Sequence, residues 1–432
     1  MHTAGEPLTV PDSKNEVHSP REHKLPSQHV PALDGLRGVA ILLVMLLHFG
    51  GSETLPGLKR MDLNGLEKAY LKVVDAGACG VDLFFVLSGF LITGILFDTK
   101  NSQRFFRTFY FRRTLRIFPL YYGVLVAVFC FLPLLHLANS SALDQVGERQ
   151  AGLWLYCTNI VIAWEETTVY NVDWLQFSHF WSLAVEEHFY LIWPAVIFAC
   201  SRKNAMKVCV GCMAVALALR LGFSGMGHKW SAYVLTPCRM DALVLGAWLA
   251  LASRGPGGMR GLLPWAWILA PLSFGLILLL SFTRNEFPSL GWPIGALSSS
   301  LYATFFGAIL IFAVNCRAGS LGEGLYCNRV LRTLGKYSYG LYVLHYLLRP
   351  ALHRLIPADT LAGWTGSPFL GLFLYASLAI ACSIIAAWLS WHVLEKHFLK
   401  LKKYFTYETT DNKLPTVSRN LPPAILSLPQ NA

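Results

Sequence analysis

The sequence predicts an all-α polytopic membrane protein with ten transmembrane helices and both termini in the cytoplasm. Its 432 residues are 54% hydrophobic and 14% charged, whereas soluble domains average about 25% charged residues. Apolar windows of about 20 residues, the length that crosses a bilayer, recur along the chain. Basic residues gather between these windows and not on one face of a soluble module. We therefore attribute the formal charge of +11 to basic loops that set the orientation of the spans in the membrane, and we expect no nucleic-acid partner.

Ten apolar windows are long enough to span a membrane. They are 36–54, 78–98, 116–137, 180–200, 205–223, 232–252, 262–282, 294–314, 338–356 and 368–394. A shorter apolar stretch at 153–164 suits either a re-entrant segment or a short span. With ten spans, all five basic loops fall on the cytoplasmic side, whereas an eleventh span at 153–164 would place the later four outside. We therefore expect 153–164 not to span. The basic loops are 100–116, 202–207, 254–260, 317–336 and 396–403.

The two ends of the chain are polar and differ from the apolar middle. Residues 1–30 contain four prolines and lack the apolar core and cleavage site of a secretory signal. Residues 401–432 are also polar, so both segments are predicted to be disordered cytoplasmic tails around a transmembrane domain at 31–400. Most of the ten cysteines lie in apolar windows, where they act as small hydrophobic residues. Cys209 and Cys212 have metal-like spacing but no second ligand pair nearby, so we expect no metal site.

The first window carries an arginine and a histidine in an otherwise apolar run. Arg37 and His48 are eleven residues apart, so on a helix they share one face about 16 Å apart. An ionisable side chain in a membrane helix is costly and indicates function. His48 is the best candidate general base, because an imidazole can accept and return a proton near neutral pH. The alternative is a buried histidine that only hydrogen-bonds a neighbouring helix.

The second window is rich in small residues, which favour close helix packing, and it contains Asp82 and Ser88. No nucleophile-elbow pattern surrounds Ser88, so packing or a helix hydrogen bond is the favoured interpretation of its hydroxyl. Arg113 and Arg116 lie three residues apart where the third window begins. They share a helix face and could bind phosphates from the cytoplasm, and coenzyme A has a diphosphate and a 3′-phosphate.

The fourth window carries Glu186, Glu187 and His188 in succession. Glu186 could orient and electrostatically support His48. Neighbouring residues point to different sides of a helix, so we expect only one of the three to face the interior. Four tryptophans in the outer loops could stack on sugar rings or form an interfacial aromatic belt. They are Trp154, Trp164, Trp174 and Trp292.

Six ordered motifs resemble those of the membrane-bound acyltransferase-3 family over about residues 30–400. They are LDGLRG at 33–38 leading to His48, GVDLFFVLSGFLI at 80–92, RRTLRIFPLYY at 112–122, HFWSLAVEEHFYL at 179–191, RMDAL at 239–243 and YSYGLYVLH at 337–345. Members of that family have a ten-span core and transfer short acyl groups, usually from acyl-CoA, to hydroxyls of carbohydrates and other acceptors. His188 departs from the glutamine that the family often carries there.

The resemblance implies that Arg37 and His48 are an essential pair, and it implies roles for further polar residues. We expect catalytic roles for His48, Arg37 and Glu186, donor binding by Arg113, Arg116, Asp82 and Ser88, and substrate binding by Trp181, Tyr122 and His345. The expected protein is a multi-pass O-acyltransferase of a bacterial plasma membrane. Its donor substrate would be acyl-CoA, first of all acetyl-CoA, with no bound cofactor. Its acceptor would be a carbohydrate or glycolipid hydroxyl, with His48 as general base or acyl carrier, and membrane lipids would be its other partners. The alternatives are a proton-coupled transporter and a non-catalytic member of the same fold.

Overall fold

The computed structural model describes residues 30–51, 54, 64–134, 140–286, 291–317 and 319–407. The predicted tails therefore fall mostly outside the described residues, at 1–29 and 408–432. The described chain is almost entirely helical, which confirms the predicted all-α class. Its long helices are α1 (Pro31–Gly50), α3 (Gly80–Asp98), α4 (Phe105–Val126), α9 (Trp181–Ala199), α10 (Arg202–Gly225), α12 (Thr236–Ala252), α13 (Leu263–Glu286), α14 (Gly291–Val314), α16 (Arg329–Leu355) and α18 (Pro368–Ser390).

Shorter elements connect these helices. They are α2 (Gly65–Asp75), η2 (Ala76–Cys79), η3 (Ala127–Phe131), α5 (Leu132–Leu134), α6 (Ser140–Gly147), α7 (Gln150–Trp154), α8 (Thr158–Glu165), η4 (Ser178–Phe180), α11 (Lys229–Val234), η5 (Arg260–Leu262), α15 (Leu321–Tyr326), α17 (Ala358–Thr365), η7 (Trp391–Glu395), α19 (Lys396–Lys400) and η8 (Leu401–Tyr404). Two short strands, β1 (Asn171–Val172) and β2 (Leu175–Gln176), pair antiparallel.

Each of the ten predicted windows overlaps one of the long helices, although the window 116–137 is displaced toward the C-terminus by about eleven residues from α4. Within the described residues, eight helical stretches are long and apolar enough to cross a membrane, so the chain is a multi-pass membrane protein. The helices α9 and α16 are not among these eight, because polar and ionisable side chains lower their hydropathy. The number ten and the cytoplasmic termini stay predictions.

The apolar stretch at 153–164 is divided between α7 and α8. The break falls at Tyr156, whose φ of 55° interrupts the helical backbone. The five residues of α7 and the eight of α8 are far fewer than the roughly 20 needed to cross a bilayer. This agrees with the expectation that the stretch does not span.

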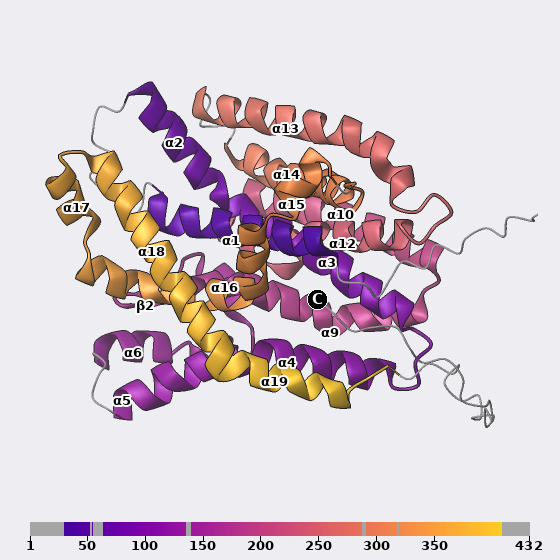
Figure 1. The fold of residues 1–432 in the computed structure, drawn as a ribbon, viewed down its shortest axis with the longest axis horizontal. Helices are drawn as coiled ribbons and strands as arrows, with labels where there is room; N and C mark the ends of the chain where they lie inside the picture. The colour runs from indigo at the N-terminus through magenta and orange to yellow at the C-terminus, as the bar shows by residue number, and fades with distance from the viewer. Residues whose placement is uncertain are drawn as a thin grey trace, which may run out of the picture. The chain divides into compact units, whose positions relative to one another are not determined.

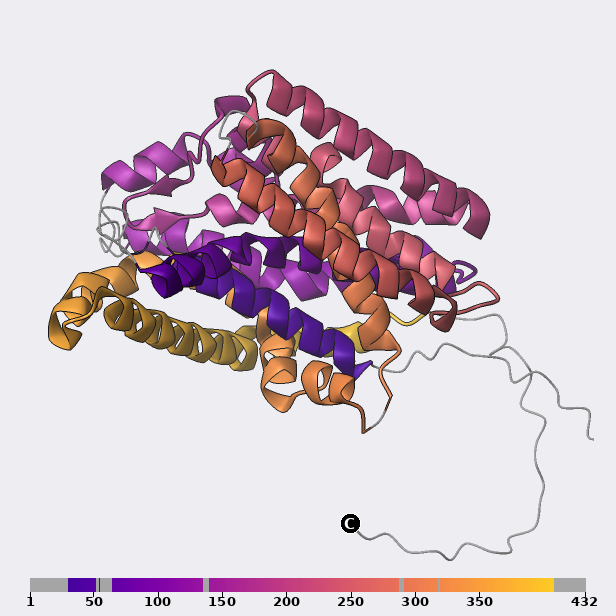
Figure 2. The ribbon, with the colours of Figure 1, turned by 90° about the horizontal axis from the view of Figure 1, so that it is seen from above.

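Two pairs of long helices approach each other closely: α1 packs along α16, and α3 packs along α12 (Figure 1). A Cβ atom on Gly38 of α1 would lie 2.0 Å from the carbonyl oxygen of Leu331. A Cβ atom on Gly89 of α3 would lie 1.8 Å from the carbonyl oxygen of Leu243. Only glycine permits such contact between backbones, a common device in membrane helix packing. On another side of the fold, α13 and α14 run side by side (Figure 2).

The last three described elements, η7, α19 and η8, lie along α4 (Figure 1). Arg112 of α4 donates hydrogen bonds to the carbonyl oxygens of Lys402 and Phe405, at 3.2 and 3.0 Å. The rings of Phe111 and Phe405 stack with centroids 4.6 Å apart. Residues 401–407, which the sequence assigned to the disordered tail, thus lie against α4. The carbonyl partners of Arg112 are almost 300 positions away in the sequence. No pattern within residues 401–407 therefore predicts that they pack against α4.

Candidate functional site

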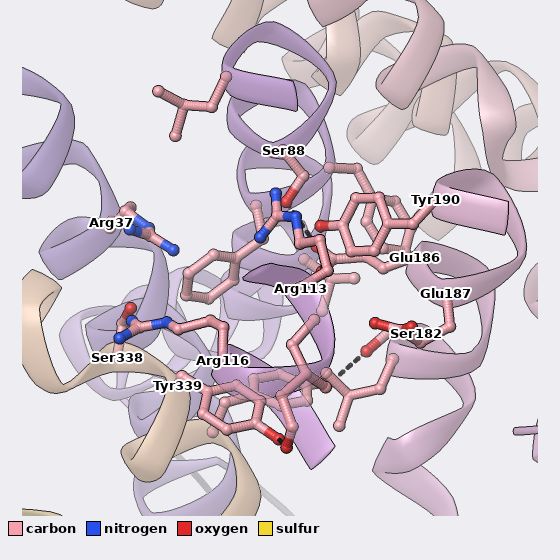
Figure 3. Close-up of a pocket in the computed structure, with 17 residues that line it drawn as sticks. Arg37, Ser88, Arg113, Arg116, Ser182, Glu186, Glu187, Tyr190, Ser338 and Tyr339 are labelled. Carbon is pink, nitrogen blue, oxygen red and sulfur yellow. Dashed lines mark hydrogen bonds between the residues drawn. The ribbon is translucent and has the colours of Figure 1, made fainter. Parts of the chain in front are cut away.

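A cavity opens between α1, α3, α4, α9 and α16 (Figure 3). Its empty volume, including the part open to solvent, is about 740 Å³. Its wall is part apolar and part polar. The apolar side chains are Val81, Phe84, Phe85, Leu91, Ile117 and Leu183, and the polar ones are Arg37, Ser88, Arg113, Arg116, Ser182, Glu186, Glu187, Tyr190, Ser338, Tyr339 and Tyr342. Five of the predicted site residues therefore meet here. They are Arg37, Ser88, Arg113, Arg116 and Glu186.

Three guanidinium groups converge on this cavity, Arg37 from α1 and Arg113 and Arg116 from α4 (Figure 3). The predicted shared face of Arg113 and Arg116 is confirmed. Arg113 lies over the ring of Tyr190, 4.5 Å from its centroid, and Arg116 lies 5.9 Å from that of Trp391. Across the part of the chain that the structure describes, no carboxylate forms an ion pair with any of the three. We call this group the arginine cluster.

The carboxylate of Glu186, on α9, lines the same cavity beside Tyr190 (Figure 3). It accepts hydrogen bonds from the Ser88 hydroxyl at 2.8 Å and from the Tyr190 hydroxyl at 2.9 Å. Ser88 thus donates its proton to a carboxylate. Glu187 also lines the cavity, so the expectation that only one of residues 186–188 faces inward is wrong. The cavity is wide enough to reach two successive residues of α9, Glu186 and Glu187. His188 points away from it, and its Nδ1 lies 2.7 Å from the hydroxyl of Thr236 on α12.

A second polar group, which we call the histidine cluster, lies toward the other end of α1. His48 Nδ1 is 2.9 Å from His345 Nε2 on α16. The His179 ring lies 5.5 Å from that of His345, and Tyr346 packs on His48 at 4.4 Å between centroids. Both ring nitrogens of the buried His179 are without a hydrogen-bond partner among the described residues. The expected contact between Glu186 and His48 is replaced by the contact between two histidines.

Tyr342 lies at the boundary between the two groups. It lines the cavity, and its hydroxyl lies 2.5 Å from the Ser182 hydroxyl and donates to the carbonyl oxygen of His179 at 3.0 Å. On the other side its ring centroid is 5.8 Å from that of His345. Tyr342 therefore contacts both the cavity of the arginine cluster and the histidine cluster.

Three other predicted site residues lie outside the cavity wall. Asp82 forms an ion pair of 2.7 Å with Arg239, whose guanidinium lies 5.6 Å from the centroid of the Trp181 ring. Arg239 is only 2% exposed, so its charge requires a counter-ion, and Asp82 supplies it. The Tyr122 hydroxyl donates to the carbonyl oxygen of Trp154 at 3.0 Å. These contacts give Asp82, Trp181 and Tyr122 structural partners away from the arginine cluster.

Two polar residues that the sequence reasoning did not single out are important in the structure. His179 appeared only as part of a motif, although it joins the histidine cluster. Arg220 of α10 pairs with Asp241 at 2.7 Å and also donates to the carbonyl oxygens of Ala296 and Cys238. A lone arginine in the apolar run 215–223 was a detectable signal, because a charge in a membrane helix needs a partner. Within the described residues, no group of three potential ligands could hold a metal ion.

The chain is similar to known proteins over most of its length. A family described as "Acyltransferase domain" matches residues 30–388. The chain is 27% identical to the Peptidoglycan O-acetyltransferase OatA of Listeria monocytogenes over 336 residues, which cover 74% of this chain and 49% of the relative. It is also 27% identical to the "Putative peptidoglycan O-acetyltransferase YrhL" of Bacillus subtilis, covering 88% of this chain and 56% of that relative. The chain thus spans about half the length of these relatives. No solved structure matches it.

Proposed function

This chain belongs to the acyltransferase-3 family, and from that premise we propose that it transfers an acetyl or other short acyl group from acyl-CoA to a carbohydrate hydroxyl. The family and the O-acetyltransferase relatives make the chain an acyltransferase, and its apolar helices make it a multi-pass membrane protein. The donor, the acceptor and the roles of individual residues are the content of the proposal.

The arginine cluster is the observation that carries the assignment of the donor. Three guanidinium groups face one cavity, and within the described residues no carboxylate lies within ion-pair distance of any of them. They outnumber the two carboxylates of the cavity wall, Glu186 and Glu187, and grouping like charges has a cost in free energy. An anionic ligand would relieve that cost. Phosphate oxygens match the planar fork of arginine, and coenzyme A has three phosphate groups in its diphosphate and 3′-phosphate. We therefore propose that Arg37, Arg113 and Arg116 bind these phosphates.

The reacting end of the donor would then lie along α1. Arg37 and His48 are on the same helix, and eleven residues correspond to about 16 Å along its axis. The pantetheine arm of coenzyme A is a flexible chain that would carry the acyl group over this distance. Tyr342, at the boundary between the two clusters, would lie beside its path. The geometry favours phosphates at the arginine cluster and the thioester at the histidine cluster.

His48 is proposed to act on the acceptor. As general base it takes the proton of the hydroxyl while the hydroxyl oxygen attacks the thioester carbonyl carbon. A C–O bond forms, the C–S bond breaks with its electron pair going to sulfur, and the imidazolium returns the proton to give the free thiol. In the alternative, an imidazole nitrogen attacks first and carries the acyl group to the hydroxyl. Both routes need an imidazole nitrogen with a free lone pair.

The relatives guide the choice of acceptor. Two of them are named as peptidoglycan O-acetyltransferases, so a sugar hydroxyl of peptidoglycan is the first acceptor to test for this chain. Because the chain spans about half of their length, fragments of other cell-surface glycans belong in the same assay.

The donor assignment is tested by steady-state kinetics in proteoliposomes with acetyl-CoA and peptidoglycan fragments. Arg113→Lys keeps the charge but removes the planar fork, and we expect the KM for acetyl-CoA to rise about tenfold or more, since a hydrogen bond to a charged group contributes about 1.5–3 kcal/mol. Arg107→Lys is the matched control, because Arg107 lies exposed on the same helix over Phe111. An unchanged KM in Arg113→Lys and in Arg116→Lys would contradict the proposed donor site.

A further inference from the structure

We infer that His345 is a positioning residue that keeps His48 in the tautomer with its proton on Nδ1, which makes Nε2 of His48 the reacting nitrogen. The catalytic part of this inference rests on the proposed function. The assignment of the tautomer rests on hydrogen-bond geometry alone.

The argument starts from the backbone of α16. Nδ1 of His345 lies 2.9 Å from the carbonyl oxygen of Leu341 and 2.9 Å from that of Tyr342. A carbonyl oxygen can only accept a hydrogen bond, so the proton of the His345 ring must be on Nδ1. In the neutral imidazole the other nitrogen then has a lone pair and no proton. His345 is fully buried, so water does not offer its ring a different set of partners.

The second step leads from His345 to His48. Nε2 of His345 lies 2.9 Å from Nδ1 of His48, and because this Nε2 can only accept, Nδ1 of His48 must donate. The lone pair of neutral His48 is consequently on its Nε2. Within the described residues Nε2 of His48 has no hydrogen-bond partner, and His48 is partly exposed while His345 is not. The nitrogen with the free lone pair is therefore the one left for a ligand.

The alternative of a doubly protonated His345 is disfavoured by its surroundings. Within the described residues, neither His48 nor His345 forms an ion pair with a carboxylate. A positive charge on the fully buried His345 would therefore have no such counter-ion there. A neutral His345 instead completes its three hydrogen bonds without any added charge.

Helix packing sets the register that this contact needs. Residue 48 of α1 and residue 345 of α16 are brought together at one end of a helix pair whose other end is held by the contact of Gly38 with the Leu331 backbone. In serine hydrolases a carboxylate fixes the tautomer of the catalytic histidine. Here a histidine anchored on the helix backbone has that task, and it adds no negative charge to the site.

The tautomer is tested by NMR of the full chain in lipid nanodiscs with ¹⁵N-labelled histidine, because protonated and unprotonated ring nitrogens differ widely in chemical shift. The His48 signals are identified by their loss in His48→Ala. We expect His48 to show an unprotonated Nε2 and a protonated Nδ1. In His345→Leu the proportion of the other tautomer should rise, and in His345→Gln the side-chain oxygen should accept from Nδ1 and retain the wild-type tautomer. His353→Leu, an exposed histidine of the same helix, is the control.

A wild-type His48 with its proton on Nε2 would overturn the inference, and so would a tautomer ratio that does not change in His345→Leu. If His345→Leu fails to fold, the wild-type spectrum decides alone. In transfer assays we expect kcat to fall about tenfold or more in His345→Leu, with unchanged KM for acetyl-CoA and partial rescue in His345→Gln. Full activity of His48→Ala together with the expected spectrum would refute the proposed function and leave the tautomer standing. Loss of activity in His48→Ala with the opposite tautomer would refute only the inference.

Discussion

Replacement of Asp82 by asparagine tests whether this carboxylate serves the fold or the donor. Asp82→Asn keeps the shape of the side chain but removes the charge that faces Arg239 at 2.7 Å. Removing one partner of a buried ion pair costs about 3–5 kcal/mol. The hydrogen bond from Arg239 to Ser299 at 2.7 Å remains, as do the rings of Phe85, Trp181 and Tyr233, 5.3 to 5.8 Å away. These unchanged partners leave the guanidinium of Arg239 partly compensated in Asp82→Asn, so we expect a loss at the lower end of that range, about 3 kcal/mol.

The assay for this prediction is thermal unfolding of the purified protein in detergent, combined with acetyl-CoA kinetics of the fraction that stays folded. We expect a lower Tm for Asp82→Asn with an unchanged KM for acetyl-CoA. The double variant Asp82→Leu with Arg239→Met should regain much of the lost stability, because it removes both charges together. A Tm equal to that of the wild type, or a KM raised tenfold at normal stability, would refute the structural role.

Two further predictions concern other parts of the fold. Gly38→Ala places a Cβ atom 2.0 Å from the Leu331 carbonyl oxygen, and we expect the separation of α1 from α16 to lower stability by about 1–3 kcal/mol; Gly275→Ala, where nothing lies within 4 Å, should not change the Tm. Burial raises the pKa of Glu166, but hydrogen bonds from Ser231 and the Trp230 amide outweigh it, so the pKa lies below its ordinary value. Glu166 therefore stabilises the fold above the unfolded pKa, near 4.5, and this contribution is lost as the pH falls through the folded pKa. Unfolding midpoints should fall with acidification less in Glu166→Gln than in the wild type, and equal pH dependence would refute this.

The sequence was sufficient for features that depend on local periodicity. The apolar windows predicted the long helices. The three-residue spacing of Arg113 and Arg116 predicted that both lie on one helix face, and both line the cavity, because helix geometry alone decides which side chains share a face. The motif resemblance also identified the acyltransferase family. Both kinds of signal are contained within short segments.

The sequence was insufficient where a residue's role depends on a distant partner. His48 and His345 are 297 positions apart, and Asp82 and Arg239 are 157 apart, so no local pattern pairs them. The motifs place Asp82 among the donor-binding residues, but a motif does not tell whether a charge faces a cavity or a counter-ion such as Arg239. The width of the cavity, which admits Glu187 as well as its neighbour, is likewise a property of five packed helices.

The central claim is that this chain moves an acyl group from coenzyme A to a carbohydrate hydroxyl with His48 at the reacting centre. The most direct measurement incubates proteoliposomes with acetyl-CoA labelled in the acetyl group and peptidoglycan fragments, and follows the label by mass spectrometry. The wild type should place the label in an O-acetyl ester on a sugar, and His48→Ala, with a normal Tm, should leave it on coenzyme A. Labelled sugar ester formed by His48→Ala at the wild-type rate would contradict the account.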